Sequence, residues 1–274
     1  MWHLNQVLTT LFDGVLYPFQ TLPPLAGLAV LSALAAALML VIFRYTSNQE
    51  EIRTAKDRVK AHILEMRLFG EDVRLLLRAQ KRILLADLAY LKCSLVPIAL
   101  MIVPVVLILV QANLRYGYRP LLPGETALVS AKVHPGAPRE TVLLGLSTGE
   151  GIVVETAPLH MEWDGEVDWR IRAQRPGRYV VGIEGAGFSV QKLVVVSNRV
   201  VAASAMRVGG QFVDVLLNPG ERPLSGKTPI KSVAIHYPRR TFSIFGRRVH
   251  WMIIFFVLSI AFAYVAKGPL RIEV

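Results

Sequence analysis

Three long stretches without a charged side chain constrain this chain more than any other feature. They cover residues 25–43, 93–113 and 249–266, and each is close to the roughly 20 apolar residues that a helix needs to cross a bilayer. Arg44 follows the first stretch directly and no Lys or Arg precedes it, so it is not a signal peptide. A buried core helix is the alternative for the second stretch, but residues 98–110 are too continuously apolar to favour it. We therefore expect an integral membrane protein with three transmembrane helices.

The distribution of basic residues predicts how these helices are oriented. Residues 1–23 contain no Lys or Arg, whereas residues 44–92 contain eleven, and positive charge favours the cytoplasmic side. The prediction is a multi-pass protein of the plasma (inner) membrane with its N-terminus outside. Residues 44–92 and the tail 267–274 are then cytoplasmic, and residues 114–248 are extracytoplasmic. Four basic residues would lie on the disfavoured, extracytoplasmic side: Arg239, Arg240, Arg247 and Arg248. This is tolerable, because a folded domain is translocated largely regardless of its charge.

Residues 1–24 precede the first span and show helical periodicity. Apolar residues recur at the spacing of one helix face, and Pro23 and Pro24 end the pattern. This indicates an amphipathic helix in the outer interface of the membrane, with an ordinary packed helix as the alternative. The apolar positions are Leu4, Val7, Leu8, Leu11, Phe12, Val15 and Leu16.

The pattern of residues 44–92 predicts a charged helical hairpin. Ser47 and Glu50 have the spacing of a capping box, an apolar heptad-like seam follows, and Gly70 divides two arms of a coiled coil. The outer face is basic and is either a plain solvated face or a contact surface for lipid headgroups, a ribosome or a nascent chain. The predicted contact face consists of Arg53, Lys56, Lys60, Arg67, Arg74, Arg78, Lys81 and Arg82.

Residues 114–248 change to short alternating runs separated by turn residues. Seven runs are predicted as strands: residues 127–133, 141–146, 152–156, 167–171, 179–183, 189–196 and 212–217. Their spacing is typical of an all-β, immunoglobulin-like sandwich. The predicted fold class is therefore an integral membrane α-helical protein with three spans and a coiled-coil hairpin, into which a β-sandwich domain is inserted.

The sequence lacks the signatures of covalent or metal chemistry. Cys93 is the only cysteine, and the six histidines show no metal-ligand spacing. No nucleophile elbow, phosphate-binding loop or dinucleotide fingerprint occurs. The net charge of +11 is not arranged as a nucleic-acid-binding face. We expect no enzyme activity, no metal, no cofactor and no specific nucleic acid recognition.

Polar residues and prolines mark the ends and the middle of the spans. A cation at a membrane boundary is usually a snorkelling anchor, but turned inward it would hydrate a space between helices. Prolines inside a span free backbone carbonyls and kink the helix. The residues concerned are Arg44, Tyr90, Lys92, Ser94, Pro97, Pro104, Gln111 and Asn113.

The order of these segments resembles the YidC/Oxa superfamily of membrane protein insertases, especially its minimal three-span members. These include archaeal YidC-like proteins and the insertase subunit of the ER membrane complex. The resemblance rests on residues 17–19 (Tyr-Pro-Phe), on the hairpin 44–91 and on residues 95–104 of the second span, and it covers about residues 1–115 and 249–274. Two features depart from the family: residues 25–43 contain no arginine, and a β domain separates the last two spans.

The resemblance implies an insertase or membrane chaperone that receives hydrophobic nascent or client membrane proteins from the hairpin, with a ribosome or other translocation components as further partners. Its client groove would be partly hydrated and lined by the eight residues of the span ends named above. The alternative is a membrane-anchored envelope scaffold whose β domain recognises a protein or glycan. A membrane enzyme or transporter is less favoured, because no span carries an acidic or histidine pair.

Overall fold

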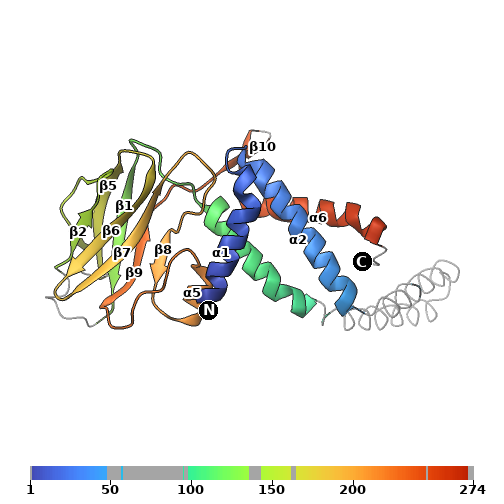
Figure 1. The fold of residues 1–274 in the computed structure, drawn as a ribbon, viewed down its shortest axis with the longest axis horizontal. Helices are drawn as coiled ribbons and strands as arrows, with labels where there is room; N and C mark the ends of the chain where they lie inside the picture. Colours follow the sequence, from blue (N-terminus) through green and yellow to red (C-terminus); the bar gives the residue numbers. More distant parts are fainter. Residues whose placement is uncertain are drawn as a thin grey trace, which may run out of the picture. The chain divides into compact units, whose positions relative to one another are not determined.

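A computed structural model describes residues 2–47, 57, 95, 98–135, 143–161, 165–244 and 246–270. The predicted hairpin, apart from Asp57 and residues 44–47, lies outside the described residues. The chain divides into two compact units, one formed by residues 1–28 and 107–254, the other by residues 29–106 and 255–274. Figure 1 shows the helices and strands of the two units.

Three helices are long and apolar enough to cross a membrane, as the sequence predicts. They are α2 (Pro24–Thr46), the second span (Ile98–Gly117) and the apolar part of α6 (Trp251–Leu270). The second span continues four residues beyond its predicted end and closes in a π-helical turn, η2 (Asn113–Gly117). The polar residues of that turn are therefore part of the span end.

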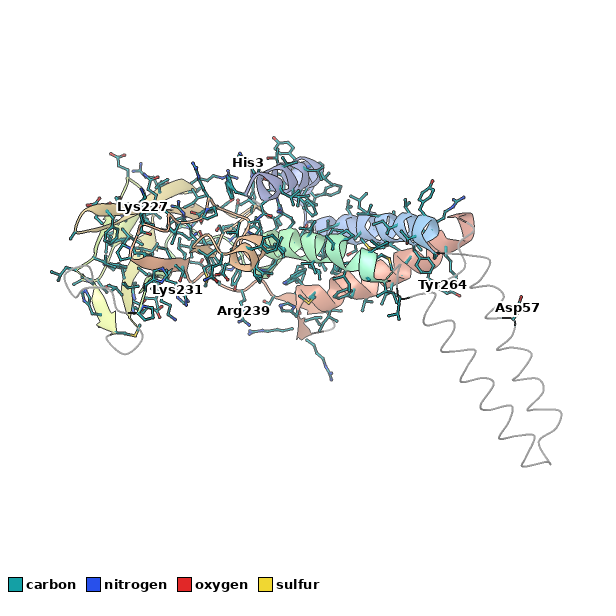
Figure 2. The ribbon with its side chains drawn as sticks, turned by 90° about the horizontal axis from the view of Figure 1, so that it is seen from below. His3, Asp57, Lys227, Lys231, Arg239 and Tyr264 are labelled. Carbon is teal, nitrogen blue, oxygen red and sulfur yellow. The ribbon has the colours of Figure 1, made fainter. Side chains whose placement is uncertain are left out.

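Small residues and leucines, among them the buried Leu31 and Leu40, form the packed face of α2. Ser32, Ala35 and Ala36 are buried, and the Ser259 hydroxyl of α6 donates to the Ser32 carbonyl oxygen at 3.4 Å. Small and hydroxyl side chains are typical of helix interfaces in membranes, where they allow close backbone approach. Near the end of α6, Tyr264 is 70% exposed and the Lys267 ammonium lies 3.9 Å from its ring centroid (Figure 2). Such pairs suit a membrane interface.

The β domain consists of two larger antiparallel sheets. One has the order β3-β5-β1-β9-β8, with β4 also paired to β5; the other has the order β2-β6-β7 (Figure 1). A separate β10–β11 hairpin leads into α6. The strands are β1 (Thr126–Val133), β2 (Gly145–Thr148), β3 (Ile152–Val154), β4 (Leu159–Met161), β5 (Glu166–Ala173), β6 (Gly177–Gly185), β7 (Phe188–Val196), β8 (Met206–Val208), β9 (Ile230–Ile235), β10 (Phe242–Ile244) and β11 (Arg247–Val249).

The two larger sheets share one apolar core. Along β5, alternate residues point inward, so Val167, Trp169 and Ile171 are almost completely buried. Ile183 of β6 and Val194 of β7 belong to the same core cluster. The prediction of a separate β domain is thus confirmed, and its immunoglobulin-like class stays a prediction.

Residues Phe212–Leu217 are a helix, α5, and the predicted strand there is wrong. The alternating apolar residues suggested a half-buried strand, yet Phe212, Val213 and Leu217 are 50–61% exposed and only Val215 is buried. No neighbouring strand pairs with this segment. Asn218 ends the helix, its backbone and side-chain nitrogens both donating to the Asp214 carbonyl oxygen, and Pro219 cannot continue it.

The N-terminal helix α1 (Trp2–Leu16) packs on the β domain. The buried Asn5 side chain donates to the Val215 carbonyl oxygen of α5 at 2.7 Å, and α1 lies beside α5 in Figure 1. A short 3₁₀ turn, η1 (Tyr17–Phe19), follows α1. Just beyond it, the Gln20 carbonyl oxygen accepts from the Val200 backbone nitrogen. Helix and β domain therefore belong to one compact unit.

Candidate functional site

A buried arginine at the end of the second span is the centre of the polar contacts at the membrane boundary. Arg115 lies in the π-helical turn η2, and its side chain is only 2% exposed. The turn ends at Gly117, where any Cβ would meet the Asn113 side-chain oxygen at 2.1 Å. A buried charge is tolerated only when it is paired and its donors are satisfied, so the neighbours of Arg115 decide what it does.

Two helices supply the acceptors for Arg115. One guanidinium nitrogen donates to the Asp13 carboxylate at 2.6 Å and to the Thr9 carbonyl oxygen at 3.0 Å, both on α1. The other donates to the carbonyl oxygen and to the side-chain oxygen of Gln111. The Phe12 ring of α1 lies 5.7 Å from the guanidinium carbon and adds a cation–π contact.

Gln111 extends this network toward α1. Its amide group exchanges hydrogen bonds with the Thr9 hydroxyl, at 3.1 and 3.3 Å, and the side chain is buried. We call Thr9, Asp13, Gln111 and Arg115 the arginine lock. Because the lock joins α1 to the last turn of the second span, it fixes the orientation of α1 relative to that turn.

The orientation of α1 leaves an apolar face uncovered. Phe12 and Leu16 are buried, whereas a neighbouring face is exposed and consists of Leu4, Val7, Leu11 and Val15, at 39–63% exposure. We call these four residues the α1 stripe. The predicted apolar periodicity therefore divides into a packed face and an uncovered face, and the interfacial position of residues 1–24 stays a prediction.

The sequence-predicted groove residues are only partly among the described ones. Gln111 and Asn113 lie on the last turns of the second span, where Gln111 is buried in the arginine lock and Asn113 is exposed. Arg44 is exposed on the last turn of α2, and Pro104 is half-buried within the second span. Tyr90, Lys92, Ser94, Pro97 and the eight basic residues of the hairpin face lie outside the described residues.

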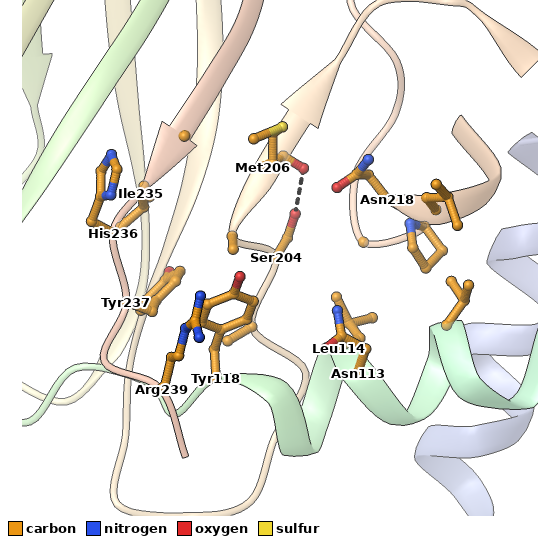
Figure 3. A pocket seen from close by; sticks show the side chains of 17 residues that line it. Asn113, Leu114, Tyr118, Ser204, Met206, Asn218, Ile235, His236, Tyr237 and Arg239 are labelled. Carbon is orange, nitrogen blue, oxygen red and sulfur yellow. Dashed lines mark hydrogen bonds between the residues drawn. The ribbon is translucent and has the colours of Figure 1, made fainter. Parts of the chain in front are cut away.

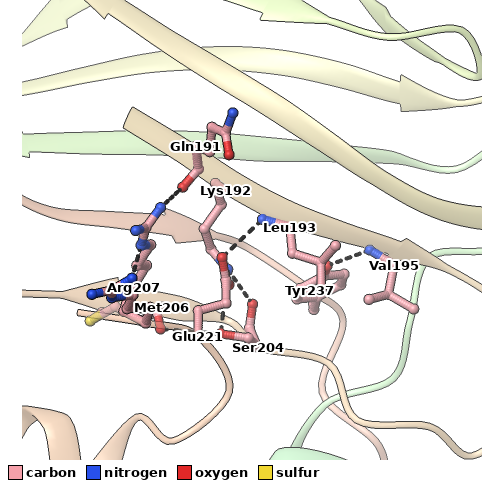
Figure 4. A network of polar contacts seen from close by, with 10 residues as sticks. Gln191, Lys192, Leu193, Val195, Ser204, Met206, Arg207, Glu221 and Tyr237 are labelled. Carbon is pink, nitrogen blue, oxygen red and sulfur yellow. Dashed lines mark hydrogen bonds and ion pairs between the residues drawn. The ribbon is translucent and has the colours of Figure 1, made fainter. Parts of the chain in front are cut away.

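A second buried cation stabilises the β domain. Lys192 of β7 has no exposed surface; its ammonium group pairs with the Glu221 carboxylate and donates to the Ser204 carbonyl oxygen at 2.6 Å (Figure 4). The other Glu221 oxygen accepts from the Leu193 backbone nitrogen at 3.0 Å. Burial lowers the pKa of Lys192, although the Glu221 charge opposes this. The pair fixes the loop that carries Glu221 on β7.

The described residues offer no recognisable catalytic or metal chemistry. Within them, no three His, Cys, Asp or Glu side chains come together as metal ligands. In the arginine lock, the Asp13 carboxylate is bound by Arg115 and the Thr9 hydroxyl by Gln111. Comparisons with protein-family models, curated proteins and solved structures found no match to this chain.

Sequence reasoning found Gln111 but missed Thr9, Asp13 and Arg115. One signal was available: Asp13 is the only Asp or Glu among the first 49 residues, on a helix that is otherwise apolar or neutral. A lone acid beside a membrane segment usually has a basic partner. The choice of Arg115 as that partner depends on a contact across 102 residues, which no local pattern encodes.

Proposed function

We propose that the protein is a membrane protein insertase or membrane chaperone of the YidC/Oxa kind, which eases hydrophobic client segments into the bilayer. One observation carries the proposal: the spans leave most of their apolar surface uncovered. In an 18-residue apolar stretch of each, only 39% of the residues of α2, 28% of the second span and 17% of α6 are buried. Uncovered helix surface accepts lipid or a client helix at similar free energy, because lipid chains are as apolar as Leu.

The proposed activity requires no covalent step. Arg44 at the end of α2 and Lys92, Ser94 and Tyr90 before the second span would admit water partway into the membrane. Partial hydration lowers the desolvation cost of a client's polar flank. The coiled-coil hairpin would deliver the client to this groove.

The packing of α1 on the β domain supports the proposed topology. Both lie on one side, which we propose is extracytoplasmic, and the single crossing by α2 then puts the hairpin in the cytoplasm of a plasma-membrane protein. We propose an immunoglobulin-like class for the sandwich, whose two sheets share one core.

The proposal is tested with the full chain in proteoliposomes and a short single-span client. A photo-reactive residue at Ile260, which is 68% exposed on α6, should crosslink to the inserting client. The matched control is a probe at Leu159 of β4, which is 63% exposed and should give no client adduct. Insertion, measured by protease protection of the client, should be faster than in protein-free liposomes. Equal rates and no adduct from Ile260 would refute the proposal.

The hairpin is tested by charge reversal. Replacing Arg74, Arg78 and Lys81 by Glu should slow client insertion, because the client or ribosome would lose its basic contact face. Replacing the exposed Arg178, Lys227 and Lys231 of the β domain by Glu gives the same change in net charge and should leave insertion unchanged.

A second candidate function is an envelope scaffold, favoured by a polar depression on the three-stranded sheet. It has a volume of about 310 Å³ and is lined by Ser147, Thr148, Gly149, Val180, Gly182, Glu184, Ser189 and Gln191. Gly182 keeps it open, because a Cβ there would meet the Ser147 hydroxyl at 2.5 Å. Small hydroxyl and amide groups suit a glycan or a peptide backbone. Adducts from Val180 to an envelope component, with none from Ile260 to clients, would favour this function.

A further inference from the structure

A cavity lies between the end of the second span and the β domain, within one compact unit. Its volume is about 320 Å³, at the lower end of the range for small-molecule sites. Strands β8 and β9, the segments flanking them, the end of α5 and the loop after it form the other walls. The arginine lock does not line it, so the cavity is separate from the site described above.

The polar and apolar groups of this cavity are unevenly distributed. Tyr118, His236 and Arg239 lie together at one end, and Asn113, Leu114 and Asn218 lie at the other (Figure 3). Val110, one turn before Leu114, and Leu217, beside Asn218, make the second end more apolar. Ser204 and Met206 line the wall between them. A molecule that filled this space would need a polar head and an apolar continuation.

The charge of the lining favours an anion at the polar end. Arg239 is an exposed cation, and the cavity is lined by no Asp or Glu among the described residues. Arg239 forms no ion pair with any residue that the structure describes, unlike Arg119, whose guanidinium is bound by both Glu125 oxygens at 2.7 Å. Tyr118 adds a hydroxyl, and phosphate oxygens are preferred partners of Arg.

The position of the cavity on a membrane span identifies the source of such a molecule. Val110, Asn113 and Leu114 belong to the final turns of the second span, which lie where lipid headgroups meet the acyl chains. A lipid of the surrounding leaflet is therefore the nearest source of a molecule with a polar head and an apolar continuation.

We propose that this cavity binds one anionic phospholipid, with its phosphate at Arg239 and Tyr118 and the beginning of an acyl chain along Leu114, Val110 and Leu217. The volume accommodates the headgroup and glycerol region, and the rest of each chain stays in the bilayer. The lipid would join the β domain to the end of the second span. The proposal does not depend on insertase activity.

Lipid retention tests the proposal on the full chain in neutral detergent. Phosphatidylglycerol, phosphatidylcholine or inorganic phosphate is added, and the bound species are counted by native mass spectrometry. We expect phosphatidylglycerol to be retained in preference to phosphatidylcholine. Arg239→Gln should reduce its retention by about tenfold, as expected for the loss of one charge-assisted hydrogen bond. Arg178→Gln, an equal charge change at an exposed site on β6, should have no effect.

A photo-reactive residue at Met206, which is 40% exposed and lines the cavity, provides a second measurement in native membranes. It should give a lipid adduct, whereas the probe at Leu159 should not. Equal retention of the two lipids, unchanged retention in Arg239→Gln, or displacement of the lipid by millimolar inorganic phosphate would each overturn the proposal. A protein adduct instead of a lipid adduct would show that the cavity receives a peptide.

Discussion

Arg115, at the end of the second span, is a charged residue whose side chain is almost completely buried, which is costly unless the charge is paired. Among the described residues, Asp13 is its only charged partner and is 42% exposed, so water can solvate the acid but not the base. Asp13→Asn should destabilise the folded protein by about 3 kcal/mol, because it leaves a buried cation without its counter-charge, although Thr9 and Gln111 still bind the guanidinium. Replacing Arg115 by Met should cost less, about 1–2 kcal/mol, since water can solvate the Asp13 carboxylate that remains.

Chemical denaturation in detergent would give these two free energies of unfolding. In the double variant the cost should be smaller than the sum of the single costs, because the two groups form one network. If the two costs simply added, Asp13 and Arg115 would not be coupled in the way that the 2.6 Å contact requires.

In the Lys192–Glu221 pair, as in the Arg115–Asp13 pair, the cation is more buried than the acid. Replacing the two partners should therefore have unequal effects. Glu221 is 12% exposed, so Lys192→Met leaves an acid that can be rehydrated. Glu221→Gln leaves a cation without access to water and should cost more, about 3 kcal/mol. Urea titration of both variants checks the order, and the opposite order would mean that Lys192 loses its proton rather than remaining charged.

Tyr237 should make the β domain less stable in alkali. Its hydroxyl accepts from the Val195 backbone nitrogen at 2.9 Å, and burial raises the pKa of Tyr237 above its ordinary value of 10.0. Above about pH 10 the unfolded chain loses this proton and the folded chain keeps it, so stability falls as the pH rises. Stability curves of Tyr237→Phe should fall less steeply above pH 10, despite a lower starting value. An unchanged slope would contradict the prediction.

At the scale of elements, α1 is the helix whose two faces have different environments. If the α1 stripe faces the membrane interface, a polarity-sensitive fluorophore at Val7 or Leu11 should shift to the blue when the protein is reconstituted in liposomes. The same label at Gln6 or Thr10, which are exposed polar positions of α1, should remain in a wet environment. Equal spectra at all four sites would show that the stripe faces water.

The helices and strands show which elements local sequence patterns can predict. The uncharged stretches predicted all three spans, because nothing else explains their length. The run 189–196 predicted a long strand, because Val190, Val194, Val195 and Val196 are β-branched residues that favour strands. The three-residue strands β4, β8, β10 and β11 are too short to show alternation, and β9 was also missed although it has six residues. In α5, apolar spacing alone suggested the wrong element, because pairing partners decide whether such a segment becomes a strand.

Local sequence patterns did not predict the arginine lock or the cavity lined by Leu114 and Ser204, for a related reason. Both form where residues more than 80 positions apart come together: Arg115 with Thr9 and Asp13, and Leu114 with Ser204. The sequence indicated that polar groups cluster at span ends. It did not indicate that the second span continues to Gly117, and this extension is what places Arg115 beside α1.

At the scale of the whole molecule, the packing of α1 on the β domain predicts that both lie in the same compartment. The charge distribution alone only suggests this. His3 and Lys227 are both exposed in the same folded unit, whereas one span separates His3 from Asp57. With Cys93 replaced by Ser, single cysteines introduced as His3→Cys and Lys227→Cys should react with an impermeant maleimide from the same side. Asp57→Cys should react only after the membrane is permeabilised, if the basic segment is cytoplasmic. Labelling of Asp57→Cys together with Lys227→Cys would mean that α2 does not cross the bilayer, and the insertase proposal would then lose the opposed compartments on which client transfer depends.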